Sequence, residues 1–306
     1  MSDRRHRLPE GGVAERVAMA DGTRLRVERW PGQRGTVLLL GGRGDFVEKY
    51  CEAIHELLAL GYGVAAADWR GQGRSGRLGD APMKGHCDSF APWVADLGQL
   101  VAWLRQTMPA PWFGIGHSMG GHLLLRWLAE GGAGLDRALL LSPMLGIQAP
   151  PLGPWATRRL ARAMVAVGRG GSWVLGGGPY VPAVVGSARQ RMLTSDPDRY
   201  PNEGWWIARD AELGIGAPTW GWLAAAFASL DALTPAALAA LTTPLLVLSP
   251  ETDGLVDVAA TRRQVAAIPG ARLRTWPGAG HELLRETDAI RGEVLAQIDG
   301  FLSGVA

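Results

Sequence analysis

Cysteine is scarce in this chain: Cys51 and Cys87 are the only two among its 306 residues. Two cysteines so far apart in the sequence cannot form a disulfide framework, and they lack the paired spacing of a zinc site. We therefore expect two packed thiols. Because free thiols persist in reducing compartments, we also expect a cytoplasmic location.

Long hydrophobic runs are missing as well. The sequence contains no stretch of about eighteen apolar residues, the length that a membrane-spanning helix needs. Residues 2–12 are polar and basic and contain no apolar segment of the kind found in signal peptides, so we expect no secretion signal.

Neither sign of charge dominates. With 31 basic and 29 acidic residues the formal net charge is +2, which gives no reason to expect nucleic acid as a partner. The chain is 47% hydrophobic and 20% charged, a composition typical of a folded globular protein. Its length suits one large domain with an insertion, or two domains.

Apolar runs and helical patterns alternate along the first part of the chain. Strands buried on both faces are predicted at 36–40, 64–67, 112–115 and 138–141, and helices at 48–60, 90–105 and 122–129. Two alternating segments around the two-residue turn signal Asp21-Gly22 predict a hairpin over residues 13–30. This order favours an α/β fold, with a mostly parallel sheet and helices on both of its faces.

The alternation stops between residues 143 and 241. Prolines bound this region, which holds helix-like runs and the tryptophans Trp155, Trp173, Trp205, Trp206, Trp220 and Trp222. We interpret residues 143–241 as an inserted helical cap between two parts of one core, residues 1–142 and 242–306. In the second part, strands at 245–248 and 272–276 are predicted to alternate with helices at 258–268 and 289–302.

The sequence Gly-His-Ser-Met-Gly-Gly at 116–121 stands between a predicted strand and a predicted helix. A nucleophilic serine needs such a sharp turn, because its hydroxyl must project from the edge of the sheet. Gly116 and Gly120 fit the places where strand and helix converge, since side chains there would clash. The alternative is an ordinary glycine-rich turn. The context favours Ser118 as a nucleophile.

A serine hydroxyl needs a base within reach, and the base needs a third group to orient it. His281 follows the predicted strand at 272–276 through a glycine loop, and Asp253 follows the strand at 245–248. Both positions fit the chain order serine, acid, histidine. Glu251 and Asp257 are the competing acids, although Asp257 fits better as the N-cap of the next helix.

An acyl-transfer site also needs N–H donors for the oxyanion of its tetrahedral intermediate. The backbone N–H of Met119, directly after the nucleophile, is one candidate. The second is the Arg43 N–H in the early loop Gly41-Gly42-Arg43, although a simple β-turn would explain that loop equally well.

The segment Gly71-Gln72-Gly73-Arg74-Ser75-Gly76 matches the dinucleotide pattern G-x-G-x-x-G. That fingerprint must open a helix whose N-terminus meets the pyrophosphate. Residues 77–82 look like a loop instead, so we do not expect a nicotinamide cofactor. A metal held by His117 and His122 is not expected either, because residues five apart do not share a helix face and no third ligand is evident.

Four segments together resemble the α/β-hydrolase family, and within it the monoacylglycerol lipase and lysophospholipase group: residues 116–121, 68–75, 253–256 and 280–283. The resemblance runs from about Thr23 to the C-terminus. It implies an eight-stranded fold and hydrolysis of lipid-like esters without a cofactor. Many relatives have His-Gly in the early loop, where this chain has Gly41-Gly42.

Our first hypothesis is therefore a serine hydrolase of lipid-like carboxylic esters. The same three residues would also suit a small-ester or lactone esterase or an acyltransferase, and a non-catalytic binding protein of the same fold is a further alternative. The aromatic cap suggests an apolar substrate pocket, or equally the cap's own core. The pocket residues we predict are Gly42, His117, Trp205, Trp206 and Trp220.

Residues 155–169 form a basic amphipathic pattern. Leu160, Met164 and Val167 fall on one side, and four arginines fall largely elsewhere. Such a helix can lie on an anionic membrane surface, which would make the protein peripheral on the inner membrane. The alternative is a solvated cap helix.

Overall fold

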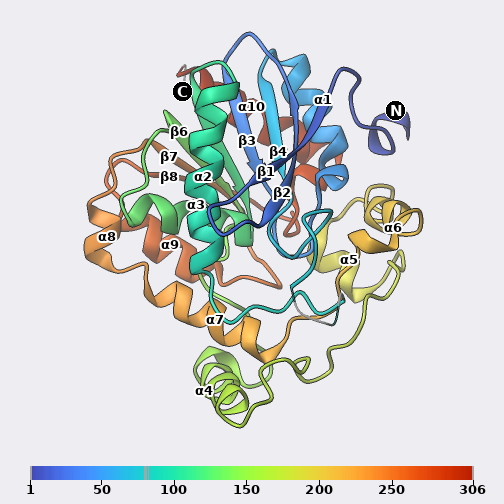
Figure 1. Ribbon diagram of the computed structural model, residues 1–306, viewed down its shortest axis with the longest axis vertical. Coiled ribbons are helices and arrows are strands. Elements are labelled where there is room, and N and C mark those ends of the chain that lie inside the picture. The colour runs from blue at the N-terminus through green and yellow to red at the C-terminus, as the bar shows by residue number, and fades with distance from the viewer. Residues whose placement is uncertain (1, 79–80, 82, 305–306) are drawn as a thin grey trace.

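The computed structural model describes residues 2–78, 81 and 83–304. Within these residues, eight strands form one sheet in the order β1-β2-β4-β3-β5-β6-β7-β8 (Figure 1). Strands β1 and β2 pair antiparallel, as do β2 and β4, and the other neighbours pair parallel. The strands are β1 (Val13–Ala18), β2 (Arg24–Trp30), β3 (Thr36–Leu40), β4 (Gly63–Ala67), β5 (Trp112–His117), β6 (Arg137–Leu141), β7 (Leu245–Pro250) and β8 (Arg272–Trp276).

Helices cover both faces of the sheet, as predicted. On one face lie α2 (Ala91–Thr107), α3 (Met119–Ala129) and α9 (Val258–Ala266), and on the other lie α1 (Cys51–Ala59) and α10 (Asp288–Ser303). Successive side chains of β3 alternate between them: Leu38 and Leu40 join the first core, whereas Val37 and Leu39 join the second. This two-sided burial is why residues 37–40 of the strand are apolar without interruption.

The predicted hairpin is present, but its connection is longer than the two-residue turn that we expected. Ala18 pairs with Arg24, so five residues join the strands. The Met19 N–H donates to the Thr23 carbonyl (2.7 Å), and Met19 is buried at 3% exposure. Because Met19 packs into the core, it belongs to the connection and not to strand β1. Asp21 and Gly22 then lie at the exposed tip of this five-residue loop.

Residues 142–244, here called the β6–β7 segment, contain α4 (Gly153–Ala166), α5 (Ala188–Leu193), α6 (Asn202–Ile207), a 3₁₀ turn (Ala211–Leu213), α7 (Trp220–Asp231) and α8 (Pro235–Ala239). Figure 1 shows α4 to α7 beyond one end of the sheet. The segment shares a core with the sheet, because Trp220, Trp222 and Phe227 of α7 belong to the same buried cluster as α2 and α3.

Sequence patterns gave the element boundaries to within a few residues. The main difference is the helix predicted at 48–60, which begins as a 3₁₀ turn (Val47–Tyr50) before α1. Further 3₁₀ turns lie at Ser2–Arg5 and Leu283–Arg285. Cys51 and Cys87 are buried free thiols, as predicted, and burial raises the pKa of both. No helix in the described residues is long and apolar enough to cross a membrane.

Candidate active site

Ser118 occupies the turn between β5 and α3 in a strained backbone conformation. Its φ is +51° and its ψ is −114°, a combination of backbone angles that residues other than glycine rarely adopt. Backbone hydrogen bonds hold the turn. The Ser118 N–H donates to the Leu141 carbonyl (2.9 Å). The Ser118 carbonyl accepts from the N–H of His122 (3.0 Å) and from that of Met144 (3.0 Å). Such strain persists where surrounding structure enforces it, and it is characteristic of functional positions.

The two glycines beside the serine are required by close approach of the backbone. A Cβ on Gly116 would lie 2.6 Å from the Gly120 carbonyl oxygen, and one on Gly120 would lie 2.4 Å from the Gly41 oxygen. No real Cβ contact is that short, so strand and helix converge as the motif predicts.

His281 and Asp253 meet although 28 residues separate them. His281 Nδ1 lies 2.6 Å from Asp253 Oδ2, and the two side chains are 3% and 0% exposed. Burial alone would raise the pKa of Asp253, but the hydrogen bond and charge of His281, with two backbone N–H donors, keep that pKa below its ordinary value. The carboxylate therefore stays ionised and can orient the imidazole.

The competing acids occupy other positions. Glu251 is exposed, and its N–H donates to the Trp276 carbonyl (2.9 Å). Asp257 is the N-cap of α9, where its Oδ1 accepts from the N–H of Ala259 (2.9 Å) and of Ala260 (3.1 Å). Of the three acids considered, Asp253 is the one hydrogen-bonded to His281.

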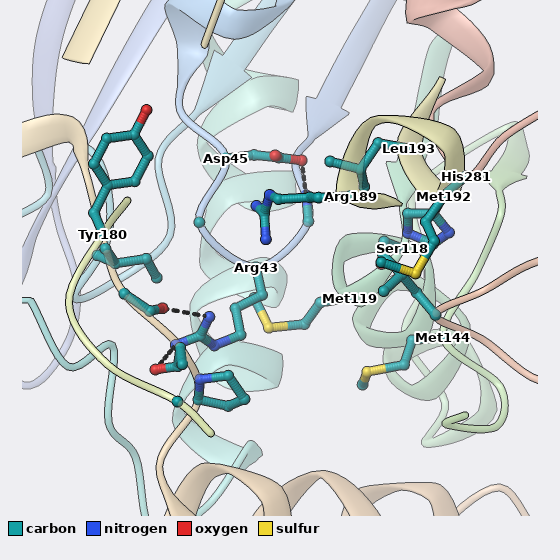
Figure 2. A pocket seen from close by; sticks show the side chains of 18 of the residues that line it. Arg43, Asp45, Ser118, Met119, Met144, Tyr180, Arg189, Met192, Leu193 and His281 are labelled. Atoms are coloured by element: carbon teal, nitrogen blue, oxygen red, sulfur yellow. Dashed lines mark hydrogen bonds between the residues drawn. The ribbon is translucent and has the colours of Figure 1, made fainter. Parts of the chain in front are cut away.

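Ser118 and His281 both line a cavity of about 510 Å³, within the usual size range of small-molecule sites. Figure 2 shows them on the same side of the cavity, with Met119 and Met144 close by. The β6–β7 segment supplies much of the remaining wall, including Gly176–Val181, Met192, Ile215 and Trp222. Apolar side chains and a few polar groups thus surround the serine hydroxyl.

Two backbone N–H groups beside Ser118 lack an acceptor within the described part of the chain. They belong to Arg43 and Met119, the two residues predicted from the sequence, and both residues line the cavity. The early loop closely approaches the serine, since a Cβ on Gly42 would lie 3.1 Å from the Ser118 Cβ. One on Gly41 would lie 2.8 Å from the Asp45 Cβ, so a side chain at position 41 would require Asp45 to move.

The sequence did not reveal the side chains that hold this loop. Asp45 Oδ2 accepts hydrogen bonds from the Gly42 N–H (2.6 Å) and the Tyr50 hydroxyl (2.5 Å). Gln72 Oε1 accepts from the Gly44 N–H (2.5 Å), and the Trp69 indole N–H donates to the Gly41 carbonyl (2.8 Å). These contacts tie the loop on both sides of Arg43 and leave the Arg43 N–H itself available.

Asp45 also belongs to a buried charge cluster below the cavity. Lys49 Nζ donates to Asp45 (2.6 Å) and Glu282 (2.7 Å) and forms an ion pair with Glu203 (2.8 Å), and Arg285 pairs with Glu282. Burial alone would raise the pKa of Asp45 and of Glu282, but the neighbouring cations outweigh it, lowering the pKa of Glu282 to about 2 and that of Asp45 well below its ordinary value. The cluster thus connects the early loop, through Asp45, to Glu282, which directly follows His281.

His117 connects this cluster to His281. Its Nδ1 lies 3.1 Å from both Asp45 Oδ2 and the Tyr50 hydroxyl, and its ring centroid lies 4.9 Å from that of His281. His122 points elsewhere: it is fully buried, its Nε2 contacts the Ser229 hydroxyl (2.5 Å), and burial lowers its pKa to about 3. In the described residues, no group of three or more His, Cys, Asp or Glu side chains could hold a metal ion.

The predicted pocket residues are only partly brought together. Gly42 and His117 line the cavity. The three tryptophans do not, which corrects that prediction: Trp205 stacks on His6 (4.1 Å between ring centroids), Trp206 packs beside Phe46, and Trp220 is in the main core. Trp222 lines the cavity instead. Helical spacing could not indicate which side of α6 or α7 faces the cavity.

The Gly71–Gly76 segment is a structural loop. A Cβ on Gly73 would lie 2.3 Å from the Asp68 carboxyl carbon, and Asp68 accepts from the N–H of Val47 and of Arg74, each at 2.8 Å. The next α-helix along the chain starts at Ala91, so the loop does not open a phosphate-binding helix. Residues 79, 80 and 82 of the predicted following loop lie outside the described residues.

Sequence comparisons identify the family to which the chain belongs. The Hydrolase_4 family model, described as serine aminopeptidase S33, matches residues 31–288. Lysophospholipase L2 of Escherichia coli (strain K12) is 30% identical over 279 residues, which cover 87% of this chain and 80% of that protein. Monoacylglycerol lipase of Mycolicibacterium smegmatis is 28% identical over 262 residues, which cover 83% of this chain and 84% of that one.

Among solved structures, a soluble variant of the monoglyceride lipase of Saccharomyces cerevisiae matches 99% of this chain and 97% of its own, with a TM-score of 0.75 and 18% identity. This likeness confirms the predicted eight-stranded α/β-hydrolase fold. The named relatives confirm the resemblance to lysophospholipases and monoacylglycerol lipases, and with it the predicted class of carboxylic ester hydrolase. The chain belongs to the Hydrolase_4 family of α/β hydrolases.

Proposed function

We propose that the protein cleaves carboxylic esters of lipid-like molecules, monoacylglycerols or lysophospholipids, with Ser118 as nucleophile, His281 as general base and Asp253 as the residue that orients His281. The observation that carries the proposal is the 2.6 Å hydrogen bond between buried Asp253 and His281, beside the cavity that His281 shares with Ser118. The names of the relatives point to the same substrates.

The reaction begins when the Ser118 hydroxyl attacks the ester carbonyl carbon. His281 Nε2 accepts the hydroxyl proton, and Asp253 stabilises the imidazolium through the hydrogen bond to Nδ1. The tetrahedral intermediate collapses when His281 returns that proton to the leaving alcohol oxygen, which leaves an acyl-serine. A water molecule, deprotonated by His281, then releases the fatty acid and restores the Ser118 hydroxyl.

The negative oxygen of each tetrahedral intermediate needs donors that are already in place. In the proposed mechanism the N–H groups of Arg43 and Met119 serve this purpose. Loss of one such donor typically raises the barrier by ~2.7–4 kcal/mol. Because Asp45 and Gln72 fix the residues on either side of Arg43, the loop need not reorganise during the reaction.

Hydrolysis of a substrate panel tests the proposal. We expect the purified protein to hydrolyse monoacylglycerols, lysophospholipids or both, and p-nitrophenyl esters of fatty acids, with fatty acid release as the measurement. Ser118→Ala should lower kcat by up to ~10⁶, as loss of the nucleophile does in a serine protease.

Ser303→Ala, at the exposed end of α10, is the matched control and should retain wild-type rates. Undiminished turnover by the Ser118→Ala variant would refute the assigned nucleophile. Failure of the folded wild-type protein on every ester of the panel would refute the substrate class.

We also propose that residues 143–241 act as the cap of this site and make contact with an anionic lipid surface. Large apolar side chains of this region are exposed: Leu152, Trp155, Val165, Val167, Leu175, Val181, Val184 and Val185. Arg159 lies over the Trp155 ring (4.3 Å), so basic and apolar groups occur together on α4. Gly176–Val181 continue from this exposed surface into the cavity wall, which would give a lipid a path to Ser118.

Flotation with vesicles of anionic lipid at low salt tests the contact. The wild-type protein should float with the vesicles, and Trp155→Ser combined with Val167→Ser should reduce the bound fraction several-fold, because both side chains are 69% exposed. Val13→Ser, on the distant strand β1, is the control. Wild-type protein that stays unbound at low salt would contradict the proposed contact.

A further inference from the structure

Arg43 is a half-buried cation without an anionic partner in the described part of the chain. Its guanidinium donates to the backbone carbonyls of Gly216 (3.0 Å) and Ala217 (2.9 Å) and lies 5.2 Å from the Trp222 ring centroid. Its Nε is buried and has no hydrogen-bond partner among those residues. Burial lowers the pKa of Arg43 to about 10, as expected for a charge that is incompletely compensated.

Arg189 of α5 lines the same cavity and is likewise without a carboxylate partner in the part of the chain that the structure describes. Figure 2 shows its side chain reaching across the cavity toward Arg43. Burial is the main cause of the lowered pKa of Arg43, and the positive charge of Arg189 lowers it further. Arg189 is exposed, so solvent offsets its charge in the free protein.

The carboxylates that line the cavity do not neutralise this pair. Asp45, Glu203 and Glu282 all lie within hydrogen-bond distance of Lys49 Nζ. Glu282 also pairs with Arg285. The acids are therefore satisfied within their own cluster, and Arg43 and Arg189 form the part of the cavity wall that carries unmatched positive charge.

We propose that Arg43 and Arg189 form a subsite for an anionic group of the ester substrate. The group would be an oxyanion carried on the alcohol side or the acyl side of the ester, either a phosphate diester or a carboxylate. Arginine suits both, because its planar donors match the spacing of two oxygen atoms. This inference rests on the proposed ester hydrolysis and specifies which esters the site prefers.

The placement of the two arginines gives the subsite its selectivity. The Arg43 N–H belongs to the proposed oxyanion hole, whereas the Arg43 side chain extends to residues 216 and 217, away from Ser118. A substrate whose carbonyl contacts Ser118 would thus place a charged group farther along the same cavity. Neutral monoacylglycerols fit the cavity as well, but they leave the two guanidinium groups uncompensated.

Matched esters test the selectivity. We compare a lysophospholipid with a phosphate diester, a dicarboxylic acid monoester with a free carboxylate, and a monoacylglycerol, with equal acyl-chain lengths for the first and third. In the wild-type protein kcat/KM should be higher for at least one of the anionic esters than for the neutral one. Arg189→Gln should reduce that ratio about tenfold, the equivalent of ~1.4 kcal/mol for one charge-assisted contact, and Arg189→Lys should recover part of it.

Arg191→Gln is the matched control on the same helix. The Arg191 side chain is exposed and donates to the Gly186 carbonyl (2.8 Å), and it does not line the cavity. This variant should keep the wild-type ratio. An equal ratio in wild type and Arg189→Gln would overturn the proposal, and the two anionic esters distinguish a phosphate from a carboxylate as the bound group.

A binding measurement separates failure of the subsite from failure of the proposed function. The full-length Ser118→Ala protein cannot turn over an ester by the proposed route, so we titrate it with dimethyl phosphate, a phosphate diester, and separately with succinate, and measure binding by calorimetry and by the shift in thermal stability. Saturable binding of either anion would support the subsite even if no ester were hydrolysed. The added substitution Arg189→Gln should weaken that binding about tenfold, and Arg191→Gln should leave it unchanged. No saturable binding of either anion would overturn it.

Discussion

The two sides of the cavity differ in how their side chains are held. The floor, formed by residues 41–50, 117–119, 253 and 281–282 at the carboxyl ends of strands, contains buried charged side chains, such as Asp45 and Glu282, that have several partners each. The roof, formed by residues 174–181 and 189–193 of the β6–β7 segment, presents apolar groups to solvent, including Leu175 at 79% and Val181 at 74% exposure. Buried ion pairs between side chains hold the floor, whereas the roof is held mainly by backbone hydrogen bonds, such as that from the Ala217 N–H to the Gly178 carbonyl (2.8 Å).

In the proposed mechanism, the floor carries out the chemistry and the roof selects the substrate. Proton transfer and oxyanion stabilisation need groups placed to within fractions of an ångström, and a buried, fully hydrogen-bonded network provides that precision. Recognition of an acyl chain needs apolar area and tolerates movement. Changes in the floor should therefore lower kcat, and changes in the roof should act mainly on KM.

The largest effect is expected in the floor at Asp253. Asp253→Asn keeps the shape of the side chain but removes the charge that orients His281, so kcat should fall by ~10⁴, as in a well-studied serine protease. Steady-state kinetics on a p-nitrophenyl ester measures the change. Asp257→Asn is the control, because Asp257 caps α9 and should affect stability by about 1 kcal/mol at most. A normal rate in Asp253→Asn would assign the role to another acid.

A smaller effect is expected at Asp45, which touches the early loop and no reacting atom. Asp45→Ala removes the acceptor of the Gly42 N–H and should lower kcat about a hundredfold through misplacement of the Arg43 N–H, with little change in KM. Asp45→Asn retains an acceptor and should recover part of kcat, which a merely structural role would not predict. Equal kcat values in Asp45→Ala and the wild type would show that Asp45 is not needed to position the Arg43 N–H.

The floor should also show an acid-dependent stability that the roof lacks. The pKa of Glu282 falls from an ordinary 4.5 to about 2 in the folded protein. A lowered pKa means that the stabilisation is fully present above about pH 4.5 and is lost as the pH falls toward 2. Glu282→Gln should thus be less stable than wild type at pH 7, and the difference should shrink between pH 4.5 and 2.

Urea denaturation at a series of pH values measures this difference. Glu10→Gln, at an exposed position of the N-terminal segment, is the control and should follow the wild-type profile. A stability difference between wild type and Glu282→Gln that stays constant over the acid range would contradict the proposed ionic role of this cluster.

The smallest effect is expected in the roof. Val181→Ser removes apolar area from the cavity wall, so KM for a long-chain ester should rise about fivefold, the equivalent of roughly 1 kcal/mol, with a smaller change in kcat. The ratio of KM for long and short acyl chains is the measurement. A large loss of kcat in this variant would remove the distinction between roof and floor.

The fold could be predicted from the sequence because each buried strand has a recognisable local pattern of residues. Residues 37–40 are all apolar because both faces of this strand are covered, and the Ser118 turn carries the glycines that close approach requires. Asp253 and His281 were predictable because each follows a strand of the same parallel sheet, whose carboxyl ends converge.

Other features depend on contacts between distant segments, which leave no local pattern. Asp45 is an ordinary acid until Lys49, Tyr50 and the Gly42 N–H surround it. The sequence could not show which tryptophans of the β6–β7 segment line the cavity and which pack in the core, because their positions depend on how α6 and α7 pack. Trp206 therefore packs beside Phe46, whereas Trp222 lines the cavity.

Covalent labelling tests the central assignment most directly. A fluorophosphonate probe reacts with a serine only when a base and oxyanion donors activate its hydroxyl. We expect one adduct per chain, located at Ser118 by mass spectrometry of its peptides, with labelling lost in Ser118→Ala and greatly slowed in His281→Ala. An adduct at a different residue, or equal labelling of the Ser118→Ala variant, would contradict the account.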